Sequence, residues 1–351
     1  MNIGAYVIRR ALLTAVVVFG TITVTFFMSH VVPNNPAILF AGQSSDPAQI
    51  KLWTERLGLD KPLYVQFETW LYQVFTGNLG DSYSFSNQPI LPLIASSLPN
   101  SFTLAALTTI LAATIGIPLG VEAAKRGGKR LDSILRIFSV SFVALPQFWL
   151  AQLLQLAFNV NLHVLPLSSY GGTLLYTAQH PINTITGSFV IDTLITGNFA
   201  AFSAITWSMV LPVTALALYP IGVIMRQTRS SMMGILSQDY IRTARAYGLS
   251  AREINYRYAL RNALPPIIVI LALVFAGSII GVVFVEDVFS LYPGLGPLIR
   301  QATGTGITSS AIGAIDYPLA LGLTIIVTIV YTVSNFAADM VHIYFDRRLI
   351  R

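Results

Sequence analysis

Residue types that usually carry catalysis or metal binding are scarce in this sequence and do not cluster. The 351 residues include no cysteine, and the four histidines, His30, His163, His180 and His342, lack the spacing of metal ligands. No phosphate-binding Gly-x-x-x-x-Gly-Lys-Ser/Thr loop, His-Glu-x-x-His motif or Gly-x-Ser-x-Gly motif occurs. We therefore expect no enzyme activity, no metal and no cofactor in this chain. If ATP drives the protein, another polypeptide must hydrolyse it.

The composition indicates what the chain does instead. Hydrophobic residues make up 54% of it and charged residues only 10%, with a mean hydropathy of +0.67. Soluble domains contain about 25% charged residues, so the sequence predicts an all-α polytopic membrane protein. A membrane-spanning helix needs about 20 apolar residues. Six segments qualify: residues 11–32, 101–123, 137–158, 205–225, 266–285 and 317–338.

The positions of the basic residues predict the orientation. The net charge of +6 could suggest nucleic acid, but 17 of the 21 Lys and Arg residues flank the predicted spans on one side. The other side has only Lys51, Arg56, Lys61 and Arg300. Because cytoplasmic loops are the basic ones, we expect a multi-pass protein of the cell membrane with both termini in the cytoplasm. Its surroundings would be the lipid bilayer, and we expect no nucleic-acid partner.

Residues 238–266 form an amphipathic, arginine-rich stretch between the fourth and fifth predicted spans. Local rules predict two short helices there. Ser237 or Asp239 would cap the first helix, because short polar side chains accept hydrogen bonds from the first free backbone amides. Gly248 would end it, because glycine adopts a positive φ without a steric penalty.

Two further spacings complete this prediction. Ser250 and Glu253 are separated as in a capping box, which would start the second helix. Ile241, Ala244 and Gly248 fall on one face of the first helix, at i, i+3 and i+7. This face is small and nearly flat, so we expect that the backbone of another protein can approach it closely.

The stretch resembles the cytoplasmic loop of ABC importer permeases, in which a helix docks into a groove of the ATP-binding subunit. The common form is Glu-Ala-Ala, three residues and Gly; here Arg242, Thr243, Ala244 and Gly248 stand at those positions, without the acid. The sequence Asp-Tyr-Ile-Arg-Thr-Ala-Arg-Ala is similar to the corresponding segment of the dipeptide and oligopeptide permeases. The resemblance implies an ATPase-coupling helix that includes Asp239, Tyr240, Ala244, Arg245, Ala246, Tyr247 and Gly248. The alternative is an ordinary basic cytoplasmic loop.

The resemblance extends over nearly the whole chain and implies its architecture and partners. It implies a type I importer permease with six transmembrane helices: a first helix with a large external region over residues 1–98, a transmembrane core over 99–344 with a coupling loop over 226–265, and a cytoplasmic tail over 345–351. It also implies a second homologous permease, two ABC ATPase subunits that bind ATP and Mg²⁺, and an extracytoplasmic substrate-binding protein.

Glycine pairs within the predicted spans indicate close helix packing. Gly116 and Gly120 in the second span, and Gly277 and Gly281 in the fifth, have the small-xxx-small spacing that lets helix backbones approach. Simple packing is the expected role of all four.

Three other residues are candidates for the external gate or the pathway. Pro146 lies in the third span, where a missing amide hydrogen would kink the helix and could widen a cavity. Glu286 and Asp287 follow the fifth span, in a segment that resembles the family's turn beside the translocation path. We expect these two acids at the external membrane boundary.

The predicted spans contain no Asp, Glu, Lys or Arg away from their ends. A proton-coupled secondary transporter usually has a titratable residue within the membrane, whereas a permease driven by a separate ATPase needs none. We therefore favour an ABC importer permease over a secondary transporter. Di- and oligopeptides are the expected substrates by resemblance. Oligosaccharides, or another small solute such as nickel, are the alternative with the same architecture.

Overall fold

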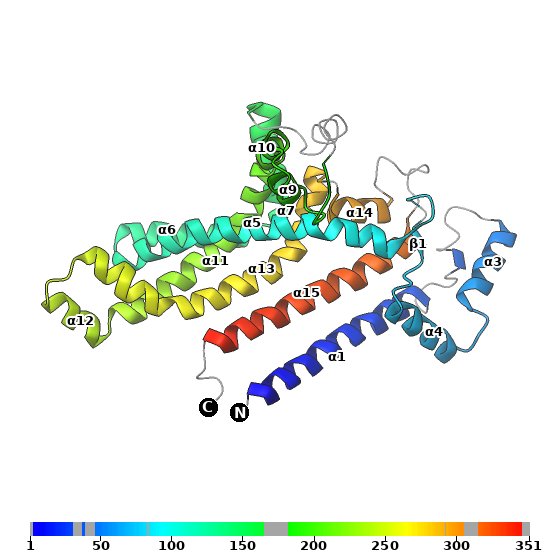
Figure 1. The fold of residues 1–351 in the computed structure, drawn as a ribbon, viewed down its shortest axis with the longest axis horizontal. Coiled ribbons are helices and arrows are strands. Elements are labelled where there is room, and N and C mark those ends of the chain that lie inside the picture. The colour runs from blue at the N-terminus through cyan, green and yellow to red at the C-terminus, as the bar shows by residue number, and fades with distance from the viewer. Residues whose placement is uncertain are drawn as a thin grey trace.

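The structure is a computed structural model that describes residues 3–30, 37–38, 46–82, 84–164, 182–291, 293–304 and 315–345. Nearly all of these residues lie in helices, and long helices run side by side through the molecule (Figure 1). The elements are α1 (Ile3–His30), α3 (Pro47–Leu57), α4 (Leu63–Phe75), β1 (Asp81–Ser82), β2 (Gln88–Pro89), α5 (Ile90–Lys125), α6 (Arg130–Ala144), α7 (Gln147–Gln155), η1 (Leu156–Asn161), α9 (Phe189–Ile195), α10 (Phe199–Ser208), α11 (Val210–Leu236), α12 (Asp239–Ala246), η2 (Glu253–Leu260), α13 (Arg261–Phe289), α14 (Leu295–Ala302) and α15 (Tyr317–Phe345).

Five helices in the described part of the chain are long and apolar enough to cross a membrane, and the bent pair of α6 with α7–η1 is long and apolar enough when taken together. The five are α1, α5, α11, the continuous η2–α13 helix and α15. The predicted span over residues 137–158 is broken at Pro146, where a kink was expected. The chain turns by 98° between α6 and α7–η1. Pro146 disfavours helical backbone at Leu145, which is extended with ψ 131°.

Helices α5 and α11 pack closely because two glycines on α5 leave no side chain between them. A β-carbon on Gly116 would lie 3.1 Å from Ile224, and one on Gly120 would lie 2.5 Å from the Cβ of Thr228 and 2.8 Å from the carbonyl of Met225. The predicted small-xxx-small pair therefore lies at a close helix contact.

A buried ion pair joins α6 to α11 near the end of the molecule that carries α12. The Asp132 side chain is 0% exposed and accepts a hydrogen bond from Arg229 Nη2 at 2.8 Å and another from the Gly128 amide at 3.0 Å. Because burial of an unpaired carboxylate is costly, this pair binds the two helices into one unit. Near the N-terminal end of α1, Arg10 pairs with Asp339 of α15.

At the opposite end, short elements cover the long helices. The β1–β2 hairpin is antiparallel, and Ser82 Oγ and the Ser84 amide donate to Asp316, just before α15, at 2.5 Å and 2.9 Å. Helix α9 is tied to α5 by Asn100, whose Nδ2 donates to the Gly187 carbonyl and whose Oδ1 accepts from the Phe189 amide, each at 3.0 Å.

The turn before α9 is organised around the buried carboxylate of Asp192. The Thr186 amide and hydroxyl donate to it at 2.8 Å and 2.7 Å, and the Gly187 amide donates at 3.1 Å. Burial alone would raise the pKa of Asp192, but the hydrogen bonds from Thr186 and its neighbours outweigh burial and lower it. The carboxylate is therefore a fixed acceptor that holds this turn.

Candidate functional site: a projecting helix and a membrane cavity

Helix α12 projects at one end of the molecule, between α11 and the η2–α13 helix (Figure 1). Its first residue is Asp239, and Gln238 occupies the N-cap position without a side-chain cap. The expectation that Ser237 or Asp239 caps the helix was wrong. Ser237 Oγ instead donates to the carbonyl of Gly234 at 2.9 Å, which satisfies the end of α11.

The end of α12 follows the predicted geometry. Gly248 has φ +76°. Its amide donates to the Arg245 carbonyl at 3.0 Å, and the Leu249 amide donates to the Ala244 carbonyl at 3.3 Å. These two bonds form a Schellman motif, which needs a left-handed residue at this position. The prediction of a positive φ at Gly248 is confirmed.

The capping box that starts the next helix is also confirmed. Glu253 Oε2 accepts from the Ser250 amide at 3.2 Å and from its hydroxyl at 2.9 Å, while the Glu253 amide donates to Ser250 Oγ at 3.3 Å. The backbone then continues through η2 into α13. A displacement of α12 would therefore act at the base of a helix that reaches the other side of the molecule.

The structure corrects which face of α12 is available to another protein. Ile241 is 0% exposed and Ala244 only 7%, and both pack in an apolar cluster with Met232 of α11 and Ile254 of η2. Ile241 and Ala244 of the predicted small, flat face are thus turned toward the chain itself, whereas Gly248 is exposed. The reason is that Ile241 is the one large aliphatic side chain of α12, and the nearest apolar surface belongs to its own spans.

The opposite face of α12 is the accessible one. Its exposed members are Asp239, Tyr240, Arg242, Thr243, Arg245, Ala246 and Tyr247, followed by Gly248. Tyr247 is 84% exposed, and apart from the neighbours of Gly248 along the chain, no described residue lies within 4 Å of the position that a Gly248 β-carbon would take. Of the residues expected to couple to an ATPase, all except Ala244 therefore lie on the accessible side.

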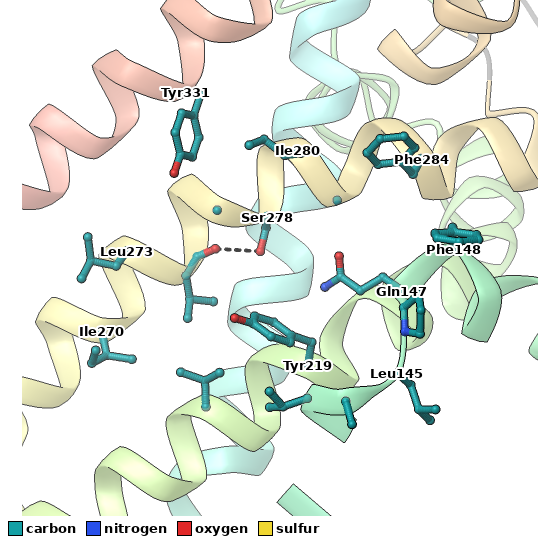
Figure 2. A pocket seen from close by; sticks show the side chains of 17 residues that line it. Leu145, Gln147, Phe148, Tyr219, Ile270, Leu273, Ser278, Ile280, Phe284 and Tyr331 are labelled. Carbon is teal, nitrogen blue, oxygen red and sulfur yellow. Dashed lines mark hydrogen bonds between the residues drawn. The ribbon is translucent and has the colours of Figure 1, made fainter. Parts of the chain in front are cut away.

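A cavity of 690 Å³ lies where the α6–α7 bend meets α11, α13 and α15 (Figure 2). None of the described residues that line it is charged. Its polar lining residues are Gln147, Tyr219, Ser278 and Tyr331, and aliphatic and aromatic side chains make up most of the remainder. Tyr219 and Tyr331 reach it from α11 and α15, on two sides of α13 (Figure 2).

Gln147 follows the bend and connects three elements. Its Nε2 donates to the Leu216 carbonyl of α11 at 3.4 Å, a long hydrogen bond. A β-carbon on Gly281 would lie 2.2 Å from Gln147 Oε1, so Gly281 makes room for this side chain and not for another helix backbone. Pro146, expected to kink a span and border the pathway, lies at the bend and lines the cavity.

Gly277 differs from its predicted role. Nothing in the described chain lies within 4 Å of a β-carbon placed there, so it packs against no other helix of this chain. It lines the cavity instead, next to Ser278, whose Oγ donates to the Val274 carbonyl at 2.7 Å. The small residue thus widens the cavity.

The two acids after the fifth predicted span do not line this cavity. Glu286 is only 1% exposed and accepts from Ser101 Oγ at 2.8 Å and from the Gly296 amide at 3.0 Å. It therefore holds the turn after α13 against α5, and its role at the external gate or pathway stays a prediction. Asp287 is partly exposed and accepts from Arg300 Nε at 2.7 Å.

The polar cavity residues Tyr219, Ser278, Tyr331 and Gln147 were not singled out from sequence. Each is one uncharged polar residue in an apolar segment, a pattern that membrane helices show often. Only their convergence from four helices makes them candidates.

The fold and these two sites define a multi-pass membrane subunit with a projecting helix and an open cavity lined by uncharged residues. In the part of the chain that the structure describes, no group of His, Asp or Glu residues could hold a metal ion. Residues 116–351 match the family described as binding-protein-dependent transport system inner membrane component, and residues 3–115 match the N-terminal membrane-component family of the same systems. The chain belongs to this family and is a permease subunit of a binding-protein-dependent ABC importer.

Named relatives match over almost their full length. The probable D,D-dipeptide transport system permease protein DdpB of Escherichia coli K12 is 36% identical over 335 residues, which is 95% of this chain and 94% of the relative. The dipeptide transport system permease protein DppB of Alkalihalophilus pseudofirmus is 33% identical, with 98% and 99% covered. The oligopeptide transport system permease protein AppB of Bacillus subtilis is also 33% identical, with 99% of both chains covered.

Proposed function

We propose that this permease forms half of the translocation pathway for di- and oligopeptides. The observation that carries the proposal is the uncharged cavity, lined by Gln147, Tyr219, Ser278 and Tyr331 among apolar side chains. An amide and hydroxyls can exchange hydrogen bonds with any peptide backbone, and the apolar walls accept varied side chains. Without a fixed charge, the cavity does not hold the peptide termini tightly, which suits passage. The three relatives described above are named for dipeptide or oligopeptide systems.

The complex would contain a second homologous permease, two ABC ATPase subunits and an extracytoplasmic binding protein. ATP and Mg²⁺ would bind in the ATPase subunits. The exposed face of α12, with Tyr240, Arg245, Ala246 and Tyr247, would dock into a groove of one ATPase. Substrate selection would lie mainly in the binding protein, because it must hold the peptide before transfer.

The same geometry supplies a route from ATPase to cavity. Movement of α12 acts on α11 and η2, because Ile241 and Ala244 pack against both. The Arg229–Asp132 pair passes movement of α11 to α6, and α6 leads into the bend at Pro146. ATP can drive this change only if the ATPases bind the two conformations with different affinity.

We further propose that both termini and α12 are cytoplasmic, whereas α9 and α10 are external. The absence of native cysteine makes single-cysteine labelling direct. An impermeant maleimide added to intact cells should label a cysteine at exposed Ser203 of α10 and leave one at exposed Thr243 of α12 unlabelled until the cells are opened. Labelling of Thr243→Cys from outside would reverse the orientation.

The substrate is tested on the reconstituted complex with its binding protein. Dipeptides should stabilise the binding protein against heat, by about 2.7 kcal/mol at a hundredfold excess over Kd. They should also stimulate ATP hydrolysis in proteoliposomes. Stabilisation and stimulation by cello- or xylo-oligosaccharides, with no response to any peptide, would contradict the peptide assignment while leaving the family assignment intact.

A further inference from the structure

The α1–α15 pair carries its own markers of the membrane boundaries. Arg10 and Asp339 pair near one end, and Tyr317 Oη donates to the Met28 carbonyl at 3.1 Å near the other. At 1.5 Å per residue, the helix from Arg10 to Met28 spans about 27 Å. This length is close to the hydrocarbon thickness of a bilayer, about 30 Å. The two contacts are therefore separated by about the thickness of the hydrocarbon core, with Met28 and Tyr317 at one end of it.

Helix α4 packs against α1 near this end. The Phe67 ring lies 5.1 Å from Phe26 and 6.4 Å from Phe19, and Trp70 Nε1 donates to the Ile22 carbonyl at 3.3 Å. Its outward stripe, at i, i+4, i+8 and i+11, is exposed and consists of Tyr64, Glu68, Tyr72 and Phe75. Aromatic side chains of this kind are enriched at the membrane–water interface, so the composition of this stripe suits a helix at that interface.

A second cavity, of 480 Å³, is lined in part by α4 and has both apolar and polar walls. Its apolar side reaches into the membrane level along α15, through Leu321, Gly322 and Ile325. Its other walls are aromatic and polar: Trp53, Trp70, Gln49, Gln66, Gln73, Asn78 and Asn87, with one cation, Arg56, and one acid, Asp81. In the described part of the chain, neither Arg56 nor Asp81 forms an ion pair, and the Arg56 guanidinium lies 5.4 Å from the centre of the Trp53 ring.

We propose that this cavity binds an amine-bearing zwitterionic phospholipid from the leaflet on the side of α4. Arg56 would bind the phosphate, since guanidinium recognises phosphate through several parallel hydrogen bonds. Asp81 would bind the ammonium of the headgroup. The acyl chains would lie along the apolar residues of α15. Phosphatidylethanolamine carries both charges, whereas phosphatidylglycerol carries only the phosphate.

The position of the cavity favours a lipid over a transported peptide. Its lining comes from α1, α3, α4, residues 78–87 and α15, and includes no residue of α11 or α13. In Figure 1, α15 lies between α1 and α13. The 690 Å³ cavity is built around α11, α13 and the α6–α7 bend. The two cavities share no lining residue, so a peptide path through the larger cavity does not include the smaller one.

The experiment is native mass spectrometry of the delipidated complex, titrated with dioleoyl phosphatidylethanolamine, dioleoyl phosphatidylglycerol or dialanine. The wild type should bind one phosphatidylethanolamine about tenfold more tightly than phosphatidylglycerol, as expected for one charge-assisted hydrogen bond. Arg56→Gln should weaken the binding of both lipids. Asp81→Asn should remove the difference in affinity between phosphatidylethanolamine and phosphatidylglycerol.

Two variants serve as matched controls. Lys51→Gln changes a cation on the same helix as Arg56, and Glu68→Gln changes an acid on the outer face of α4; neither residue lines the cavity. Both should bind lipid like the wild type. Unchanged phosphatidylethanolamine binding by Arg56→Gln would overturn the proposal. So would dialanine that displaces the lipid in the wild type and fails to bind Arg56→Gln, because the cavity would then be a peptide site.

Discussion

The α12 segment and the membrane cavity are built by different kinds of contact. Along α12, the helix end at Gly248 and the capping box of Ser250 and Glu253 depend on residues within a few positions of one another. The cavity takes residues from α7, α11, α13 and α15, which lie far apart in the sequence. A short motif therefore predicts a helix terminus well, but it does not say which lone polar residues will meet across a bundle.

Within α12 as well, local contacts and contacts between distant residues determine different properties of the helix. Its C-terminal end follows local rules, whereas the direction of its faces depends on packing against α11 and η2. Ala244, placed on a docking face by helical spacing, is buried in the chain itself. Exposure is thus a property of the whole fold, and substitutions can test each part of this difference.

The largest effect is expected where the two regions are joined. Arg229→Ala would leave the Asp132 carboxylate buried without its cation, which typically costs about 3–5 kcal/mol. We expect a lower unfolding temperature of the purified complex and loss of substrate-stimulated ATP hydrolysis. Arg136→Ala is the control, because Arg136 is 54% exposed and 3.9 Å from Asp132, and it should have little effect. Equal stability of both variants would show that the buried pair does not join α6 to α11.

The next effect separates the two faces of α12. Ala244→Glu would put a carboxylate into the apolar cluster with Ile241, and burial of an unsatisfied polar group costs about 1–3 kcal/mol by mutational data. We expect it to lower thermal stability and coupling together. Ala246→Glu, on the exposed face, should lower coupling alone. Thermal unfolding and ATPase assays on the same preparations check this, and the reverse pattern would restore the predicted docking face.

In the cavity, two glycines four residues apart should respond differently. Gly281→Ala would push a methyl group into Gln147, and overpacking of this kind costs about 1–3 kcal/mol. Gly277→Ala meets open space. We expect peptide transport to fall in the first variant and to persist in the second. If both behave alike in proteoliposome uptake, Gln147 is not held at the bend as the structure has it.

At the C-terminal end of α12, the expected loss of stability comes from backbone strain. Gly248→Ala would place a β-carbon at φ +76°, which costs about 1–2 kcal/mol. The control is Gly234→Ala within α11, which also meets no atom but has helical backbone, and it should be neutral or slightly stabilising. Coupling is measured as substrate-stimulated ATP hydrolysis, and we expect it to fall in Gly248→Ala only. Normal stimulation in Gly248→Ala would contradict the Schellman geometry.

The smallest effect concerns pH. The folded pKa of Asp192 is lowered, so its contribution to stability is complete above the ordinary carboxyl pKa and is lost as pH falls through the folded value. Lowering the pH from 7 to 5 should therefore not weaken the α9 turn through this group. Hydrogen exchange of the Thr186 and Gly187 amides should stay protected over this range, after correction for intrinsic rates. Loss of protection near pH 6 would contradict the assignment.

The sequence by itself determined the class of protein, most of the spans, the C-terminal end of α12 and the start of the helix after it. Runs of apolar residues, basic flanks, a glycine and a capping box act over one span or one helical turn, so short windows contain the needed information. The bend at Pro146 was predicted only as a kink, because a proline changes local backbone preference but does not set the angle between helices.

Tertiary structure alone decided which residues share a space. It buried Ile241, Ala244 and Glu286, brought Gln147 against Gly281, and placed Arg56 and Asp81 on one cavity. These outcomes depend on contacts between residues that are distant along the chain. The physical reason is that burial is decided by the apolar area available from all neighbouring helices together.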